Sequence, residues 1–244
     1  MWQWNYNIIF IQSGNTMIQN SKHTMALLLL SLAFQIKGLT NISLLKRYLP
    51  TNPIIIEAGA HNGSDTVKLS SLWPQSTIYA FEPVPELFDE LKKKITDCGN
   101  VIALPLALGD KIGTSKFHVS SKEGTGSSSL LTPKAHLHHF PWINFNREIE
   151  VSTVTIDEFA RQNQLEKIDL LWLDLQGYEY YVLKASPDIL KRVTVIATEV
   201  NFFELYNGCV LYPAYRKWLE SHGFVQVHME RPHTSWGDAV FVRQ

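Results

Sequence analysis

The sequence predicts an α/β fold: a mostly parallel sheet with helices on both faces and an antiparallel hairpin at one edge. Two observations predict it. Segments typical of buried strands alternate along the chain with segments of helical periodicity, as in proteins with a parallel sheet. The last two strand-like segments, Phe224–Glu230 and Asp238–Gln244, have no helical segment between them, which indicates an antiparallel pair.

The regular alternation begins after Pro53. Residues 54–59 form a continuous apolar run of the kind that a strand buried on both faces shows. A helical segment follows at 64–73, then a second strand at 77–82. Residues 85–95 predict an amphipathic helix, because leucine and isoleucine recur on one face and proline suits its first turn.

Residues 100–108 predict a third strand, after which the alternation breaks. Strand-like segments at 115–120 and 147–157 flank a long polar loop, and a loop of that length in a compact domain is usually functional or mobile. We expect its three histidines, His136, His138 and His139, to face water. Thr155 and Glu158 then have the spacing of a capping box at the start of a helix.

The second half of the chain continues the strand and helix alternation. Strands are predicted at 168–174 and 193–200, with a helix from about Tyr178 between them. A further helix at 213–222 ends at Gly223, and the closing hairpin follows.

Residues 1–50 are predicted to be a helical or partly disordered extension, and residues 51–244 to form one domain. The apolar run at 25–34 has about half the ~20 residues that a membrane-spanning helix needs, so we expect no membrane span. A packed N-terminal helix is the preferred interpretation, and a signal segment or an anchor is the alternative. The two cysteines, Cys98 and Cys209, match no metal or redox spacing, and a cytoplasmic location suits them.

The charge balance argues against a nucleic-acid partner. The chain has 22 Lys and Arg against 23 Asp and Glu, a formal net charge of −1 and a sequence pI of about 6.8. Non-specific binding to nucleic acid requires a basic surface that this composition does not supply.

The turn after the first strand predicts a ligand site. Its glycines, Gly59 and Gly63, are four residues apart, unlike those of a dinucleotide fingerprint or a Walker loop. Glu57 would repel a pyrophosphate and attract a cation. Glu82 ends the second strand, where a carboxylate can accept both hydroxyls of a ribose. S-adenosylmethionine, which has a ribose and positive centres but no phosphate, fits this pattern; a tight turn without a ligand is the alternative.

Two further acids end the middle strands of the predicted sheet. Asp174 follows the strand at 168–174 and Glu199 ends the strand at 193–200, so both are candidates to accept a proton from an acceptor hydroxyl. Glu179 is as readily explained as a carboxylate at a helix N-terminus. Asp174 and Glu199 could also hold a divalent cation, but no third ligand is evident and no metal site is predicted.

Five segments together resemble the FkbM family of S-adenosylmethionine-dependent methyltransferases. They are EAGAHNG, AFEPVPELFDEL, ALPLALGDKIG, VSTVTIDEF and IDLLWLDLQGYEYYVLKA, in the family's order, with a closing GDAVFVR. The resemblance covers about residues 53–243 and implies a class I, Rossmann-like methyltransferase with a seven-stranded sheet. The cofactor-binding residues that we expect are Glu57, Gly59, Ala60, Asn62, Gly63, Glu82, Pro83, Leu106, Ala107 and Asp174.

The resemblance implies transfer of a methyl group to a hydroxyl oxygen of a sugar or another small polyhydroxylated acceptor. Asp174 is the first candidate for the base and Glu199 the second, while His61 lies between the glycines and could contact cofactor or acceptor.

The serine-rich segment 123–131 is expected to cover the site, with Ser128 or Ser129 touching substrate. Trp172 stands where the family often has lysine, and we interpret it as a core residue. The alternatives are a non-catalytic cofactor-binding or scaffold domain and an NAD-dependent dehydrogenase.

Overall fold

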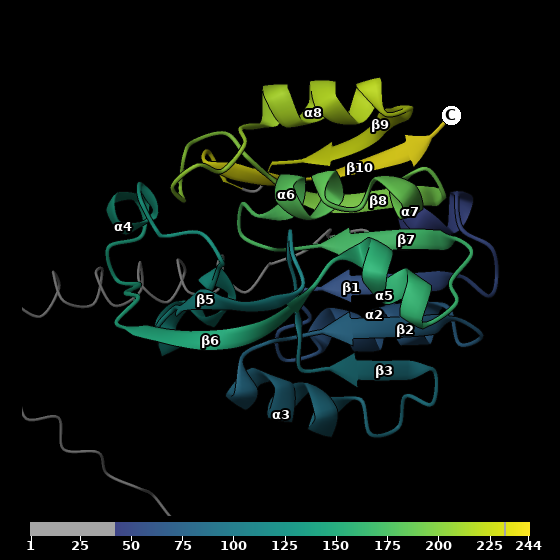
Figure 1. Cartoon of the computed structure of the whole chain (residues 1–244), viewed down its shortest axis with the longest axis horizontal. Coiled ribbons are helices and arrows are strands. Elements are labelled where there is room, and N and C mark those ends of the chain that lie inside the picture. The colour runs from purple at the N-terminus through teal and green to yellow at the C-terminus, as the bar shows by residue number, and fades with distance from the viewer. Residues whose placement is uncertain (1–41, 232) are drawn as a thin grey trace, which may run out of the picture. The chain divides into compact units, whose positions relative to one another are not determined.

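The main sheet has seven strands in the order β3-β2-β1-β7-β8-β10-β9 (Figure 1). The computed structural model describes residues 42–231 and 233–244. The strands are β1 (Ile54–Ala58), β2 (Thr77–Phe81), β3 (Val101–Leu104), β7 (Ile168–Leu173), β8 (Val193–Asn201), β9 (Phe224–Glu230) and β10 (Trp236–Arg243). Strand β10 runs antiparallel to β8 and β9, and the other pairings are parallel. The predicted α/β fold, with its mostly parallel sheet and antiparallel edge, is confirmed.

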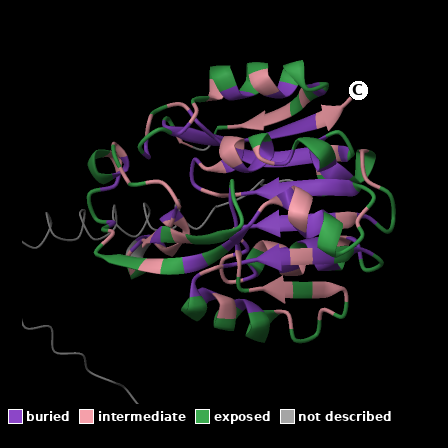
Figure 2. Cartoon of the chain, in the orientation of Figure 1, coloured by how far each residue is buried: buried purple, intermediate pink, exposed green. Residues whose placement is uncertain are grey.

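Helices cover both faces of this sheet. On one face pack η1 (Ile42–Arg47), α2 (Ser64–Leu72) and α3 (Pro85–Lys94). On the other face pack α5 (Ile156–Gln162), α6 (Glu179–Lys184), α7 (Pro187–Leu190) and α8 (Tyr212–Ser221). Figure 2 shows the central strands almost entirely buried and the helices exposed on their outer sides. The core therefore consists of two apolar layers that sandwich the sheet.

Strand β7 shows why the apolar runs predicted the fold. All six of its residues are buried, because helices cover both of its faces. Trp172, on this strand, packs with Val195 of β8 and Val240 of β10 on the face that η1 covers. Its interpretation as a core residue is confirmed.

The third predicted strand is divided between two sheets. Strand β3 ends at Leu104, and a separate β4 (Ala107–Leu108) joins a small sheet of order β4-β6-β5 with β5 (Gly113–Val119) and β6 (Arg147–Val154). The prediction of one strand over 100–108 is therefore wrong. Pro105 lies at the break; it has no N–H to donate to a ladder and so favours the point at which the chain leaves the main sheet.

The long polar loop contains two short helices, η2 (Lys122–Ser127) and α4 (His136–His139). His136 is buried, and its ring packs against Phe140, Phe145 and Tyr206. The expectation that it faces water is wrong, because aromatic side chains from neighbouring segments surround it. His138 is exposed, as expected.

Only the end of the predicted N-terminal extension can be described. Helix η1 precedes residue 51 and contributes Ile42 and Leu45 to the core. Residues 1–41, including the apolar run at 25–34, lie outside the described residues, so the domain boundary stays a prediction. In the part of the chain that the structure describes, no helix has the length and apolar character needed to cross a bilayer.

Candidate active site

The turn after β1 packs directly against the end of β7. Gly59 and Ala60 both donate a backbone hydrogen bond to the carbonyl of Phe81, at 3.1 and 2.9 Å. The Asp174 amide donates to the Ala58 carbonyl at 3.0 Å. Gly59 has φ +85°, and a Cβ there would lie 2.1 Å from the Asp174 carbonyl oxygen. The close approach of these two turns is sufficient to require glycine at position 59.

Replacing Gly59 by alanine is expected to lower the free energy of unfolding by at least ~2 kcal/mol. The added methyl group would meet a backbone oxygen that cannot move independently, and the left-handed backbone adds strain. Chemical denaturation measures the loss. Gly99→Ala is the matched control, since no atom lies within 4 Å of a Cβ built there, and it should change stability by less than ~0.5 kcal/mol. Equal stability of the two variants would contradict the packing argument.

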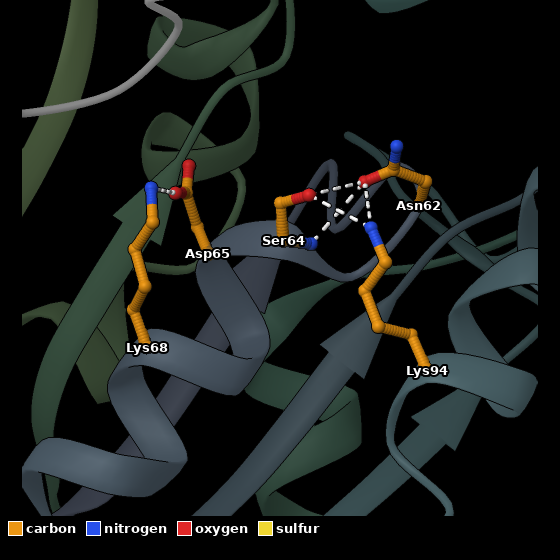
Figure 3. A network of polar contacts seen from close by, with 5 residues as sticks. All are labelled: Asn62, Ser64, Asp65, Lys68 and Lys94. Carbon is orange, nitrogen blue, oxygen red and sulfur yellow. Dashed lines mark hydrogen bonds and ion pairs between the residues drawn. The ribbon is translucent and has the colours of Figure 1, made fainter.

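The second half of the turn is held by side chains of α2 and α3. Asn62 Oδ1 accepts hydrogen bonds from the Ser64 amide at 3.2 Å, the Ser64 hydroxyl at 2.8 Å and Lys94 Nζ at 3.1 Å (Figure 3). Figure 3 also shows Lys68 paired with Asp65 outside this group. A Cβ on Gly63 would lie 2.8 Å from Leu91 Cδ1 of α3. Asn62 and Gly63 therefore have structural roles here, and their contact with a cofactor stays a prediction.

Two buried carboxylates lie next to this turn. Glu82 accepts a backbone hydrogen bond at each oxygen, from His61 to Oε2 and from Val84 to Oε1, both at 2.8 Å. Burial raises the pKa of Glu82 to about 7. Glu57 is also buried, and its Oε2 has no hydrogen-bond partner among the described residues. Burial raises the pKa of Glu57 to about 8; the neighbouring Thr66 hydroxyl lowers it, and Asp65 and Glu82 raise it further. A cation bound here would stabilise the ionised form of both groups.

Three further residues predicted to bind the cofactor, Pro83, Leu106 and Ala107, lie along the chain after β2 and β3. The Glu82 amide donates to the Leu104 carbonyl at 3.1 Å, which joins the ends of these strands. Pro83 and Leu106 are half-buried. Ala107 is buried, and its side chain packs in the core beneath the small sheet. The roles of Pro83, Leu106 and Ala107 in cofactor binding stay predictions.

Asp174 and Glu199 are brought together by a residue that sequence reasoning missed. Gln176 Nε2 donates to Asp174 Oδ1 at 2.5 Å and to Glu199 Oε2 at 2.8 Å. The hydroxyl of Tyr206 lies 3.0 Å from Gln176 Oε1 and 2.7 Å from the Ser127 carbonyl oxygen. An amide group thus lies between the two carboxylates that were the candidate ligands of a divalent cation. No group of three or more His, Cys, Asp or Glu side chains in residues 42–231 and 233–244 is arranged to hold a metal.

A hydrogen bond to the Glu179 side chain closes the turn between β7 and α6. Glu179 is buried, and its Oε1 accepts from the Leu175 amide at 2.7 Å. Burial raises the pKa of Glu179 to about 8. Gln176 has φ +54° and is followed by Gly177 at φ +93°. The sequence Asp-x-x-Gly-x-Glu indicates a tight turn here, but no pattern in it identifies Gln176 as the bridge.

The long loop contacts both turns of the site. His61 Nε2 lies 2.7 Å from Thr125 Oγ1 of η2. Ser129 Oγ donates to the Gln176 carbonyl at 3.0 Å and is fully buried, so its hydroxyl has an internal role. Ser128 Oγ accepts from the Ser120 amide at 3.0 Å. The segment therefore connects the turn after β1 with the turn after β7, next to the carboxylates.

Comparison with known proteins agrees with this arrangement. The methyltransferase FkbM domain matches residues 57–225. A 2-O-methyltransferase, NoeI, of Sinorhizobium fredii is 31% identical over 172 residues, which cover 68% of this chain and 70% of that protein. A hexuronic acid methyltransferase, AglP, of Haloferax volcanii is 23% identical over 161 residues, 66% of this chain and 61% of that protein. The chain is therefore a methyltransferase and belongs to the FkbM family.

Proposed function

We propose that the protein transfers a methyl group from S-adenosyl-L-methionine to a hydroxyl oxygen of a sugar or a similar polyhydroxylated acceptor. The observation that supports it most is the row of acids at the carboxyl edge of the sheet: Glu57 and Glu82 on one side, and Asp174 and Glu199 on the other. Ligands of open parallel sheets bind at this edge.

The acids beside the turn after β1 fit this cofactor. Glu57 Oε2 is buried without a hydrogen bond in the described part of the chain, and an ammonium group would satisfy it. Glu82 retains acceptor capacity beyond its two backbone bonds, because each carboxylate oxygen has two lone pairs, and these suit ribose hydroxyls. When bound, S-adenosyl-L-methionine supplies an electrophilic methyl group on a sulfonium.

Asp174 is proposed to accept the proton of the acceptor hydroxyl. Its Oδ1 is used by Gln176, and no described residue forms a hydrogen bond with its Oδ2. A carboxylate oxygen available beside the cofactor turn can orient the hydroxyl and take its proton as the oxygen becomes a nucleophile. Glu199 accepts a hydrogen bond from the second Nε2 proton of Gln176 and completes the acceptor side of the site.

The relatives support a sugar acceptor, since one is named for 2-O-methylation and another for a hexuronic acid. The test is a screen of neutral sugars, uronic acids and short glycans with methyl-labelled cofactor, with and without EDTA. Transfer of label to a hydroxyl supports the proposal, and its loss with EDTA would add a metal requirement. Tight binding of S-adenosyl-L-methionine without transfer to any acceptor would favour a scaffold role, and tight binding of NAD a dehydrogenase.

Cofactor affinity is expected to increase as the pH rises from 6 to 8. The raised pKa values, about 8 for Glu57 and about 7 for Glu82, mean that the free protein holds protons there below these values. A cationic ligand favours the ionised carboxylates, so binding must release protons, and this cost disappears above pH ~8. Calorimetric titration in two buffers of different ionisation enthalpy measures the release directly. An affinity that is constant over this pH range would contradict the linkage.

A further inference from the structure

Gln176 uses both ends of its side-chain amide in one buried network. Nε2 has two protons, one for Asp174 Oδ1 and one for Glu199 Oε2. At the other end, Oε1 lies 3.0 Å from the Tyr206 hydroxyl, and both Gln176 and Tyr206 are buried. Because both carboxylates accept, only this orientation of the amide gives each of them a proton. The single proton of the Tyr206 hydroxyl is shared between Gln176 Oε1 and the Ser127 carbonyl oxygen, which lies 2.7 Å away. Turning it over would place Oε1 against two carboxylate oxygens.

The backbone of Gln176 is held in an unusual conformation. Its φ of +54° is in the left-handed region, which costs free energy for a residue with a Cβ. Its carbonyl accepts the Ser129 hydroxyl at 3.0 Å, and this contact comes from the loop that also presents Ser127 to Tyr206. The surrounding structure therefore determines both the backbone and the side-chain orientation of Gln176.

We propose that Gln176 is a positioning residue that sets the orientation of Asp174 for proton acceptance, and that Tyr206 fixes the orientation of the Gln176 amide. The inference rests on the proposed function, in which Asp174 takes the acceptor proton. By donating to both acids, the amide reduces the repulsion between Asp174 and Glu199 and keeps Asp174 Oδ2 available. Through Tyr206 and Ser127, segment η2 is connected to the base.

A double-mutant cycle tests whether Gln176 acts through Asp174. Gln176→Asn keeps an amide and a residue that tolerates the left-handed backbone, but it is one methylene shorter and cannot reach both carboxylates. It is expected to lower kcat by about 10- to 100-fold, the range for loss of a hydrogen bond to a charged group, with cofactor Kd unchanged. In an Asp174→Asn background the same change should have little further effect. The same factor in both backgrounds would overturn the proposal.

The role of Tyr206 is tested by a matched pair of buried tyrosines. Tyr206→Phe removes the hydroxyl beside Gln176, whereas Tyr215→Phe removes one that lies 3.3 Å from Thr198 Oγ1. We expect Tyr206→Phe to lower kcat about 10-fold at unchanged cofactor Kd, and Tyr215→Phe to leave kcat within about twofold. Equal kcat for wild type and Tyr206→Phe would overturn the role of Tyr206.

A measurement independent of turnover separates this inference from the proposed function. If no acceptor is methylated by the wild type, the proposed function fails, and the network is judged by hydrogen exchange of the Gln176 side-chain amide protons. They should exchange at least about 10-fold more slowly than those of the exposed Gln164, and Tyr206→Phe should accelerate them while Tyr215→Phe does not. Exchange as fast as that of Gln164 in the wild type would overturn the inference whatever the activity.

Discussion

Replacing Asp174 by asparagine is expected to lower kcat by at least about 100-fold while cofactor affinity stays within a few-fold of wild type. The change is nearly isosteric, and the asparagine oxygen can still accept from Gln176 Nε2, so the bridge survives. What is lost is the ability to take a proton, and general base catalysis typically contributes about 10²- to 10⁴-fold. Single-turnover kinetics with labelled cofactor measures the step, and calorimetry measures the affinity.

Asp169 supplies the matched control for this experiment. It is also on β7, but at the amino end of the strand, where its Oδ2 accepts from the Ile54 amide at 2.9 Å and its Oδ1 pairs with Lys167. Asp169→Asn keeps an oxygen for the Ile54 amide and should leave kcat within about threefold of wild type at a temperature where the variant is folded. A wild-type kcat for Asp174→Asn would remove Asp174 from the chemistry and make Glu199 the next candidate.

The placement of the acids could be predicted because parallel strands present their carboxyl ends at one edge. Glu57, Glu82, Asp174 and Glu199 each lie at or near the carboxyl end of a predicted strand, so their proximity follows from the fold class. The number of strands was implied by the family resemblance, whereas their order is known from the structure. Alternation of strands and helices fixes a parallel sheet without fixing which strands are neighbours.

The connection between the acids could not be predicted in this way. Gln176 and Tyr206 are 30 residues apart and meet only because the segment after β8 folds back over the turn after β7. The burial of His136 could not be predicted for the same reason, since it depends on rings from the segments around Phe140 and Tyr206. Such contacts are made by irregular segments, whose course depends on packing and has no periodic pattern in the sequence.

The sequence pattern assigns the two glycines of the first turn to a ligand site, and the structure provides a different reason for them. The structure shows that a Cβ on Gly59 would meet the Asp174 carbonyl, and one on Gly63 would meet Leu91. The packing of the turn after β1 against the end of β7 and against α3 therefore explains both glycines before any ligand is considered.

Glu82→Ala is expected to weaken binding of S-adenosyl-L-methionine by about 100-fold, or ~2.7 kcal/mol of binding free energy. Two effects act together. The proposed ribose acceptor is lost, and the His61 and Val84 amides lose the oxygens that hold the turn after β1 against β2. Calorimetric titration of the folded variant with the cofactor measures the change in Kd.

Two further variants separate these effects. Glu82→Gln keeps one acceptor oxygen but turns an NH₂ group toward one of the two backbone donors, so it should retain part of the affinity and fall between wild type and Glu82→Ala. Glu179→Gln neutralises another buried acid of raised pKa, about 8, yet its oxygen can still accept from the Leu175 amide. That control should keep Kd within about threefold. If Glu82→Ala binds as tightly as Glu179→Gln, Glu82 does not contact the ribose. The turn after β1 would then be held without it, and the recognition of the cofactor would have to depend on Glu57 and the backbone instead.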